Sequence, residues 1–366
     1  MAASPDTLAR VEELTARRLN RTLLARQHLL ARSTQTAHDL IHHLVAVQAQ
    51  ESNAPYISLW TRLEAFEKDD LTALLADRRA VRSSILRGTQ HIATDDDYPW
   101  LRPTVQPVLD RGRQGAFGRV TAGVDPVELA ALARKHLTGQ TLTRPALARL
   151  LAERWPDVEP LALGWSAQCL LPVVHPPPSG TWGRFGATPF VLAEEWLGRP
   201  MAAPDAERLV VRYLAAFGPG SARDVQAWSG LTRLREVLER LPLRRYRTPA
   251  GVVLYDLPDA PLADEDAPAP VRLVPEFDNL LLAHADRTRV IADAHRRVVI
   301  TGAVVRPTFL VDGFVRGMWS MTGAGIVLAP FEAITEAARD ALTREAAELL
   351  RFAGTEGSVS FTAPGH

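Results

Sequence analysis

Residues 207–241 read ERLVVRYLAAFGPGSARDVQAWSGLTRLREVLERL, and this stretch decides the fold class. Its apolar residues recur at helical spacing on either side of the turn at 218–221, and a second turn follows at 230–232. Short β-prone runs at 251–257 come next and would supply a wing. The pattern predicts a helix-turn-helix unit with helices at 207–217, 222–228 and 234–241.

The same succession of helix, polar turn and helix recurs nearer the N-terminus. At 128–154 two apolar-periodic stretches flank the turn at Thr141, where Thr143 is placed to cap and Pro145 to occupy a first turn. A helix is predicted at 7–31, with Asp6 as its cap. A further helix from Thr36 has an apolar face that reaches Val47, so Gln48 and Gln50 are expected at a helix end.

The C-terminal part is predicted to be rich in β-structure. Asp312-Gly313 marks a tight hairpin, because these residues tolerate positive φ angles. One amphipathic helix over 331–352 closes this part. Strand-like runs lie at 272–274, 289–291, 298–301, 308–311 and 314–319.

The predicted fold class is α+β, mainly helical, because three helical units are each followed by β-prone or irregular sequence. At 366 residues the chain exceeds the roughly 250–300 residues at which one core stops growing, so several modules are expected. Winged helices occur in both enzymes and repressors, so the fold does not by itself decide the function. The expected division is 1–120, 121–203 and 204–258 for three winged-helix modules, and 271–366 for a β-rich subdomain.

Composition limits the cofactors and partners. Lys+Arg and Asp+Glu number 42 each, which counts against simple nucleic-acid binding unless the positive charge is concentrated locally, as in the arginine-rich segment 233–247. The only cysteine, Cys169, excludes an internal disulfide, and the histidines lack metal-ligand spacing, so no metal or cofactor is expected. Without a leader or a long apolar run, the expected location is the bacterial cytoplasm, at the nucleoid, with no membrane contact.

Several separated blocks, in order, resemble the tandem winged-helix DNA glycosylases that include AlkZ and YcaQ. This family removes alkylated bases and unhooks interstrand crosslinks. The resemblance implies a C-shaped molecule with a concave channel for double-stranded DNA that contains alkylated purines. The blocks are Leu44–Gln50, Leu86–His91, Phe217–Asp224, Pro275–Asp278, His284–Arg287 and Leu310–Gly313.

The resemblance implies that Gln48 and Gln50 are the catalytic pair, since the family carries a glutamine, an apolar residue and a second polar residue. Gln48-Ala49-Gln50 matches the form with glutamine last, the AlkZ-like branch, which implies bulky or crosslinking adducts as substrates. An N7-alkylguanine is already cationic, so its departure needs no strong general acid. A glutamine amide can orient water and contact the sugar or a phosphate. Gln50 is expected to hold the water, although exchanged roles are nearly as well supported.

Other residues in these blocks are candidates for contact with DNA. Arg87 is placed either to bind phosphate or to pair with the acidic run at 95–97. His91 contacts the DNA backbone or shapes the pocket, and a buried, hydrogen-bonded structural histidine is an equal alternative. Glu51 is an alternative carboxylate base, although an exposed helix-end acid is the simpler interpretation. The hairpin at 312–313 and the segment 286–298 are candidates either to enter a groove or to cover the core. The remaining candidates for DNA binding, whose spacing also fits a structural role, are Phe277, Asp278, His284 and Arg287.

The resemblance thus predicts a monofunctional, monomeric glycosylase that acts on N7-alkylated guanine in DNA repair or in self-resistance to a genotoxic natural product. One alternative is a winged-helix transcription regulator, in which 207–241 reads the major groove and the glutamines are incidental. Another is a family member that binds damaged DNA without cleaving it. Cleavage of a lesion-bearing duplex separates the first interpretation from both others.

Overall fold

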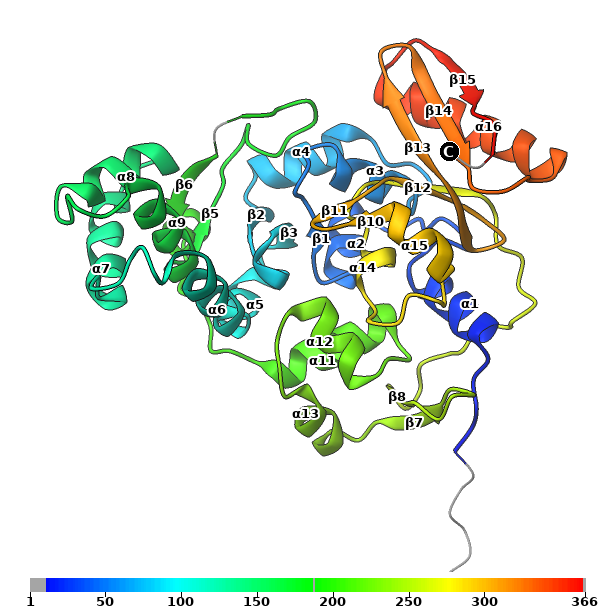
Figure 1. Ribbon diagram of the computed structural model, residues 1–366, viewed down its shortest axis with the longest axis horizontal. Coiled ribbons are helices and arrows are strands. Elements are labelled where there is room, and N and C mark those ends of the chain that lie inside the picture. The colour runs from blue at the N-terminus through cyan, green and yellow to red at the C-terminus, as the bar shows by residue number, and fades with distance from the viewer. Residues whose placement is uncertain (1–10, 187, 365–366) are drawn as a thin grey trace, which may run out of the picture.

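A computed structural model describes residues 11–186 and 188–364 and shows an α+β protein that is mainly helical (Figure 1). The helical unit built from residues 126–197 lies at one side of the molecule, and the largest sheet lies at another, with the C-terminal helix beside it. Within the described residues, no helix combines the length and the apolar character that a membrane crossing requires.

The N-terminal part is built around a small antiparallel sheet with strand order β1-β3-β2. The predicted helix at 7–31 is observed over Ala16–Arg26, and residues 7–10 lie outside the described part. The elements are α1 (Ala16–Arg26), α2 (Ala37–His43), β1 (Val47–Gln48), α3 (Ala54–Trp60), α4 (Lys68–Ala76), β2 (Ala80–Ser84), the 3-10 helix η1 (Leu86–Gly88), β3 (Gln90–Thr94), α5 (Tyr98–Thr104) and α6 (Gln106–Phe117).

The prediction that α2 continues to Val47 is wrong. Thr36 caps the helix as its sequence suggests, but the helix ends at His43. Val45 then adopts a φ of 67°, a left-handed conformation that is costly for a β-branched residue. Its side chain is completely buried, so tertiary packing imposes this turn and leads the chain into β1.

Residues 126–197 form a unit with a hydrophobic core of its own, which includes Leu129, Leu147 and Leu163. The predicted pair of helices is confirmed. Thr143 accepts a hydrogen bond from the Ala146 amide at 3.3 Å, and Pro145 occupies the first turn. The elements are α7 (Pro126–Leu137), β4 (Leu142–Thr143), α8 (Arg144–Ala152), α9 (Pro160–Leu170), β5 (Val173–Val174), β6 (Pro189–Leu192) and α10 (Ala193–Leu197).

Three helices follow, as residues 207–241 predict, and a strand lies within the predicted β-prone run at 251–257. The strand that pairs with it, at 244–247, lies in the arginine-rich segment and was not predicted. Gly230 ends the second helix with a φ of 81°, and a Cβ there would lie 2.9 Å from Val108 Cγ1 and 3.2 Å from Arg87 Cα. Glycine therefore allows this helix end to approach the backbone of Arg87. The elements are α11 (Ala206–Phe217), α12 (Ala222–Ser229), α13 (Leu234–Arg240), β7 (Arg244–Arg247) and β8 (Val253–Asp256).

The C-terminal part contains a sheet of order β15-β14-β13-β12-β9, with α16 closing the chain as predicted. The segment 289–291 is not a strand, and most of 298–301 belongs to a helix end or a short strand. The elements are β9 (Arg272–Val274), α14 (Asn279–Leu282), α15 (Asp293–Val299), β10 (Ile300–Thr301), β11 (Val304–Val305), β12 (Thr308–Val311), β13 (Phe314–Thr322), β14 (Gly325–Pro330), α16 (Glu336–Ala353) and β15 (Ser358–Phe361).

The predicted Asp312-Gly313 hairpin is confirmed, with φ angles of 50° and 78°. Its role in entering a DNA groove stays a prediction, since the Asp312 side chain is half-exposed. Asp312 pairs with Arg17 at 2.8 Å and also with Arg21, both on α1. The hairpin turn therefore packs against the first helix.

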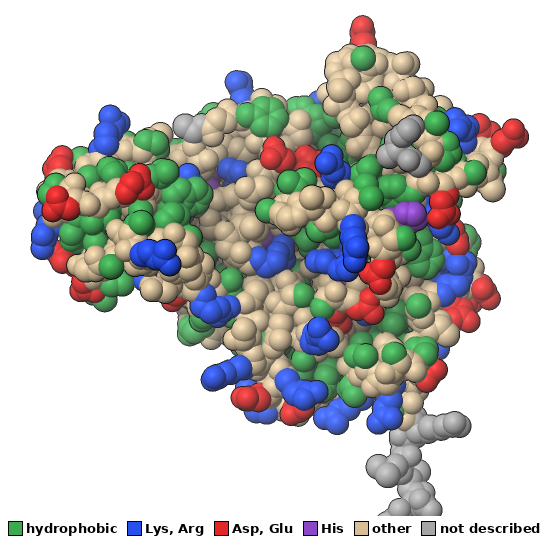
Figure 2. All heavy atoms as spheres, in the orientation of Figure 1, with side chains coloured by type: hydrophobic (Ala, Val, Ile, Leu, Met, Phe, Trp, Pro, Cys, Tyr) green, Lys and Arg blue, Asp and Glu red, His purple; other side chains and the backbone are tan. Residues whose placement is uncertain are grey.

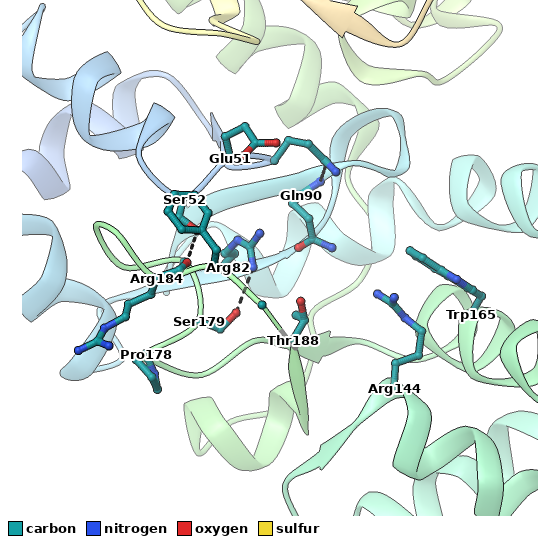
Figure 3. A pocket seen from close by; sticks show the side chains of 14 residues that line it. Glu51, Ser52, Arg82, Gln90, Arg144, Trp165, Pro178, Ser179, Arg184 and Thr188 are labelled. Carbon is teal, nitrogen blue, oxygen red and sulfur yellow. Dashed lines mark hydrogen bonds between the residues drawn. The ribbon is translucent and has the colours of Figure 1, made fainter. Parts of the chain in front are cut away.

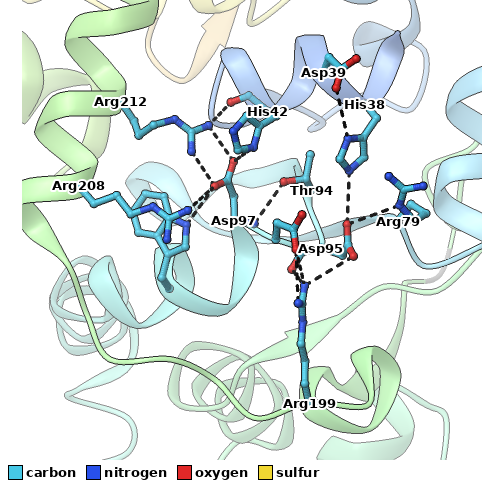
Figure 4. A network of polar contacts seen from close by, with 12 residues as sticks. His38, Asp39, His42, Arg79, Thr94, Asp95, Asp97, Arg199, Arg208 and Arg212 are labelled. Carbon is cyan, nitrogen blue, oxygen red and sulfur yellow. Dashed lines mark hydrogen bonds and ion pairs between the residues drawn. The ribbon is translucent and has the colours of Figure 1, made fainter.

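A buried carboxylate joins the N-terminal part to α11 (Figure 4). Asp97 is fully buried and contacts His42 Nδ1 at 3.0 Å and Arg212 Nη1 at 2.8 Å. Arg199 pairs with the neighbouring Asp95 and Asp96. The acidic run at 95–97 is thus occupied by residues other than Arg87, contrary to one of the two predictions for that arginine.

Candidate active site around Gln48 and Gln50

Gln48 lies in a β-strand and not at a helix end. In β1 it is the partner of His91 in β3, and the Ala49 amide continues the pairing with a 2.8 Å hydrogen bond to the Gln90 carbonyl. β1 ends at Gln48, and Gln50 lies in the bend that follows. The Gln-Ala-Gln segment therefore begins in a strand and continues into a bend.

The Gln48 side chain is held in one orientation by two contacts. Arg87 Nη2 donates to Gln48 Oε1 at 2.6 Å, and Gln48 Nε2 donates to Thr89 Oγ1 at 3.0 Å. The guanidinium can only donate, and the Thr89 hydroxyl gives its own proton to the Leu86 carbonyl, so the amide cannot be reversed. Only 4% of Gln48 is exposed, and the second N–H of its amide has no partner among the described residues.

Gln50 is exposed and lines a pocket of about 570 Å³. Its side-chain oxygen, Oε1, accepts one long hydrogen bond, from the backbone N–H of Gln90 at 3.5 Å. Such a contact is weak, so the Gln50 amide is free to bind a ligand or a water molecule. The two glutamines thus differ: one is fixed and the other is available.

Arg87 is a cation with no carboxylate partner among the described residues. It lies in η1 with a φ of 54°, and its Nη1 donates to the Trp228 carbonyl at the end of α12. Burial lowers its pKa to about 10, with a further contribution from the charge of Arg287. Arg87 therefore stays charged at neutral pH, polarises the Gln48 amide and leaves a positive charge available to an anion.

His91 is completely buried beneath Arg87. Its Nδ1 lies 2.9 Å from the Thr89 carbonyl, so this nitrogen carries the proton, and Nε2 lies 3.5 Å from Arg87 Nη2. Burial, together with the charge of Arg87, lowers the pKa of His91 to about 3. His91 is a neutral residue that shapes the site, and its burial favours the structural interpretation over contact with DNA.

Burial likewise favours a structural role over DNA contact for two further candidates. Asp278 is buried against Arg62, with Nη2 to Oδ1 at 2.7 Å, and its Oδ1 accepts from the Leu280 amide that begins α14. His284 is 1% exposed and contacts the Phe217 carbonyl at 3.2 Å. Both residues hold the interior of the protein together.

Phe277 and Arg287 remain candidates for DNA contact. Phe277 has a φ of 58° and is partly buried against the core. Arg287 donates from Nε to the Leu281 carbonyl at 2.7 Å, and its guanidinium is half-buried near Arg296. Figure 2 shows Lys and Arg side chains gathered in the middle of this face of the molecule. An excess of positive charge thus exists locally, although the net charge is zero.

Sequence reasoning missed the residues that hold the backbone of the glutamine pair. Arg82 donates to the Ala49 carbonyl, and Asn279 Nδ2 donates to the Ala46 carbonyl at 2.8 Å. Both are buried. The sequence offers one indication of the role of Arg82: it is a charged residue inside a β-prone run, directly after the apolar Val81.

The class of protein follows from the comparison with known families, which identifies a DNA glycosylase. The sequence model of the AlkZ-like DNA glycosylases matches residues 41–352, and the chain belongs to that family. It is 26% identical over 357 residues to an interstrand DNA cross-link repair glycosylase of Streptomyces sahachiroi, over 90% of this chain and 94% of that protein. Its fold resembles the solved structure of the Streptomyces sahachiroi DNA glycosylase AlkZ, with a TM-score of 0.80 and 23% identity over 96% of this chain and 100% of the other.

Proposed function

We propose that the protein is a monofunctional glycosylase that hydrolyses the N-glycosidic bond of N7-alkylated guanine in double-stranded DNA, including bulky adducts and interstrand crosslinks. The observation that carries this proposal is the contrast between the fixed amide of Gln48 and the free amide of Gln50 at a pocket. The similarity to a crosslink repair glycosylase supports the wider substrate range. The biological role is DNA repair or self-resistance to a genotoxic product.

The chemistry needs a positioned water more than it needs a strong acid. The alkylated base is cationic before cleavage and leaves as a neutral molecule, so the reaction passes through an oxocarbenium-like sugar without protonation of the leaving group. In this proposal Gln50 Oε1 accepts a hydrogen bond from the attacking water. Gln48, fixed and polarised by Arg87, uses its remaining N–H to contact the sugar or a phosphate.

The DNA is proposed to lie in a concave channel lined by tandem winged-helix modules, with the chain acting as a monomer. Arg87 and Arg287 contribute phosphate contacts. Their guanidinium groups lie near each other, and neither forms an ion pair with a carboxylate among the described residues. The three helices and two strands of 206–256 support the winged-helix interpretation. An open channel accommodates bulky adducts that a snug base-flipping pocket excludes.

The test is incubation with a duplex that carries one N7-methylguanine, followed by alkaline treatment and a denaturing gel. We expect strand cleavage by the wild type and its loss in a Gln48→Ala, Gln50→Ala double variant that still binds the duplex. The absence of cleavage by the wild type on this duplex and on a bulky-adduct duplex, with binding retained, contradicts the proposal.

A further inference from the structure

The pocket beside Gln50 lies between the N-terminal sheet and the unit of α8 and α9 (Figure 3). Its volume of about 570 Å³ falls within the ~300–1,000 Å³ of typical small-molecule pockets. Gln50 contributes to its wall from one side, and Arg144 and Trp165 contribute from the other. A molecule in this pocket therefore lies next to the proposed reaction centre.

Gln90 places an unsatisfied acceptor in this pocket. Arg144 donates twice to Gln168 Oε1, at 3.1 and 2.9 Å, so Gln168 must turn its Nε2 to Ser84 Oγ at 2.8 Å. Gln90 Nε2 donates to the same hydroxyl at 2.9 Å. Gln90 Oε1 is then buried with no hydrogen-bond donor among the described residues. A buried acceptor without a donor is destabilising, and a ligand with an N–H group would satisfy it.

Arg144 offers a flat surface at the same pocket. Its guanidinium carbon lies 3.4 Å from the centroid of the Trp165 ring, and Trp165 stacks in turn on Phe117 at 6.3 Å and 15°. One face of the guanidinium is thus covered by an aromatic column, and the centroid of the buried Phe190 ring lies 5.6 Å from the same carbon. A guanidinium plane held in this way is of the kind on which nucleobases stack.

We propose that this pocket receives the departing alkylguanine, with Gln90 Oε1 accepting a hydrogen bond from the guanine N2 amino group and the base stacking on Arg144. The inference rests on the proposed glycosylase activity and adds a specificity-determining residue to it. A phosphate group is a poorer ligand for this position. Gln90 Oε1 needs a hydrogen-bond donor, and a phosphate dianion has only acceptors.

The charge of the pocket favours the base after cleavage. Among the lining residues, Arg82, Arg144 and Arg184 stand against one carboxylate, Glu51. A cationic N7-alkylguanine is repelled by this surface, and the neutral base that leaves is not. Interactions that improve as the bond breaks lower the barrier to cleavage.

The first experiment measures binding of free 7-methylguanine to the full-length protein, by NMR titration, so that no catalytic activity is required. We expect Gln90→Met, which keeps the length of the side chain and removes the acceptor, to weaken binding about tenfold. Gln140→Met, at an exposed position beyond α7, serves as the matched control and should bind as the wild type does.

The second experiment compares single-turnover excision of 7-methylguanine with that of 7-methylhypoxanthine, which lacks the N2 amino group, from otherwise identical duplexes. The wild type should prefer 7-methylguanine about tenfold, and Gln90→Met should remove the preference. Equal preference in both proteins, or unchanged binding of free 7-methylguanine, overturns the proposal.

Two other outcomes separate a failure of the pocket proposal from a failure of the proposed glycosylase function. If Gln90→Met and Arg144→Met weaken binding of undamaged duplex and reduce its salt dependence, with free 7-methylguanine binding unchanged, the pocket is a phosphate site and the proposal is wrong. If the wild type binds free 7-methylguanine but excises nothing from either duplex, the pocket is confirmed as a base site and the proposed glycosylase function fails.

Discussion

The guanidinium of Arg82 donates two hydrogen bonds, 3.1 and 3.0 Å long, to the carbonyl oxygen of Ala49. Ala49 separates the two glutamines, so Arg82 fixes the backbone from which both side chains project. The same guanidinium donates from Nη1 to Ser179 Oγ at 3.2 Å, which links this strand to the next unit. Arg82 is therefore a positioning residue for the glutamine pair.

Replacement of Arg82 should affect excision more than DNA binding. We expect Arg82→Met to lower the single-turnover rate about 100-fold, because displacement of reacting groups by about 1 Å costs that much. Arg82→Lys, which can still donate to Ala49, should recover part of the loss. Arg102→Met is the control, since Arg102 is equally buried and also binds backbone carbonyls, those of Cys169 and Leu171. Equal rate losses in Arg82→Met and Arg102→Met would mean that Arg82 has only a structural role.

The free amide of Gln50 predicts a graded response to substitution. Gln50→Leu removes the acceptor for water and should lower the rate about 100-fold. Gln50→Asp keeps an acceptor and should stay within about tenfold of the wild type. Its rate should fall as the pH drops toward the ordinary aspartate pKa of about 3.9, because the carboxylate is a stronger acceptor than the carboxylic acid. Single-turnover rates between pH 4 and 8 check both variants. A Gln50→Leu variant with the wild-type rate would assign the water to another residue.

Replacement of Arg87 should affect both the affinity for DNA and the rate of excision. Arg87→Met leaves Gln48 Oε1 without its donor and removes one proposed phosphate contact. We expect slower excision and a decrease of about one in the slope of log affinity against log salt concentration. The measurement is fluorescence anisotropy of a duplex at several salt concentrations. Arg154→Met, on an exposed residue that pairs with Glu128, should leave the slope unchanged. An unchanged slope in Arg87→Met rules out the phosphate contact.

The helix-turn-helix unit could be predicted because its signals are local. Ser221 and Asp224 form a capping box at the start of α12, and Gly230 ends that helix. The hairpin at Asp312-Gly313 was predictable for the same reason. Each of these features depends on residues within a few positions of one another.

The backbone of the candidate site could not be predicted in this way. An apolar run such as Leu44–Val47 fits the end of a helix and a buried strand equally well, and the positive φ of Val45 comes from tertiary packing. The contact of Arg82 with Ala49 spans 33 residues, and that of Arg62 with Asp278 spans 216. No local pattern marks such partners, so the sequence leaves open whether Asp278 has a structural role or contacts DNA.

Asp278 should matter for stability and not for DNA contact. Asp278→Ala leaves Arg62 as a buried cation without its carboxylate, which typically costs about 3–5 kcal/mol of unfolding free energy. Urea denaturation measures this loss. Asp286→Ala, at an exposed position in the next block, His284–Arg287, serves as the control and should change stability by less than about 0.5 kcal/mol. Full stability of Asp278→Ala with weakened duplex binding would restore the original DNA-contact prediction.

The buried histidines predict loss of stability in acid. Burial lowers the pKa of His175 to about 3, whereas an unfolded histidine titrates near 6.5. Between these values the unfolded state binds more protons, so the free energy of unfolding falls as pH drops below about 6.5, by up to ~1.4 kcal/mol per pH unit for each such histidine. His175→Asn keeps a donor for the Pro189 carbonyl and removes the titration. Urea unfolding between pH 7 and 5 should show that the free energy of unfolding declines less steeply in this variant, by about that amount. Parallel curves for the variant and the wild type would contradict the prediction. They would mean that His175 has the same pKa in the folded and unfolded states.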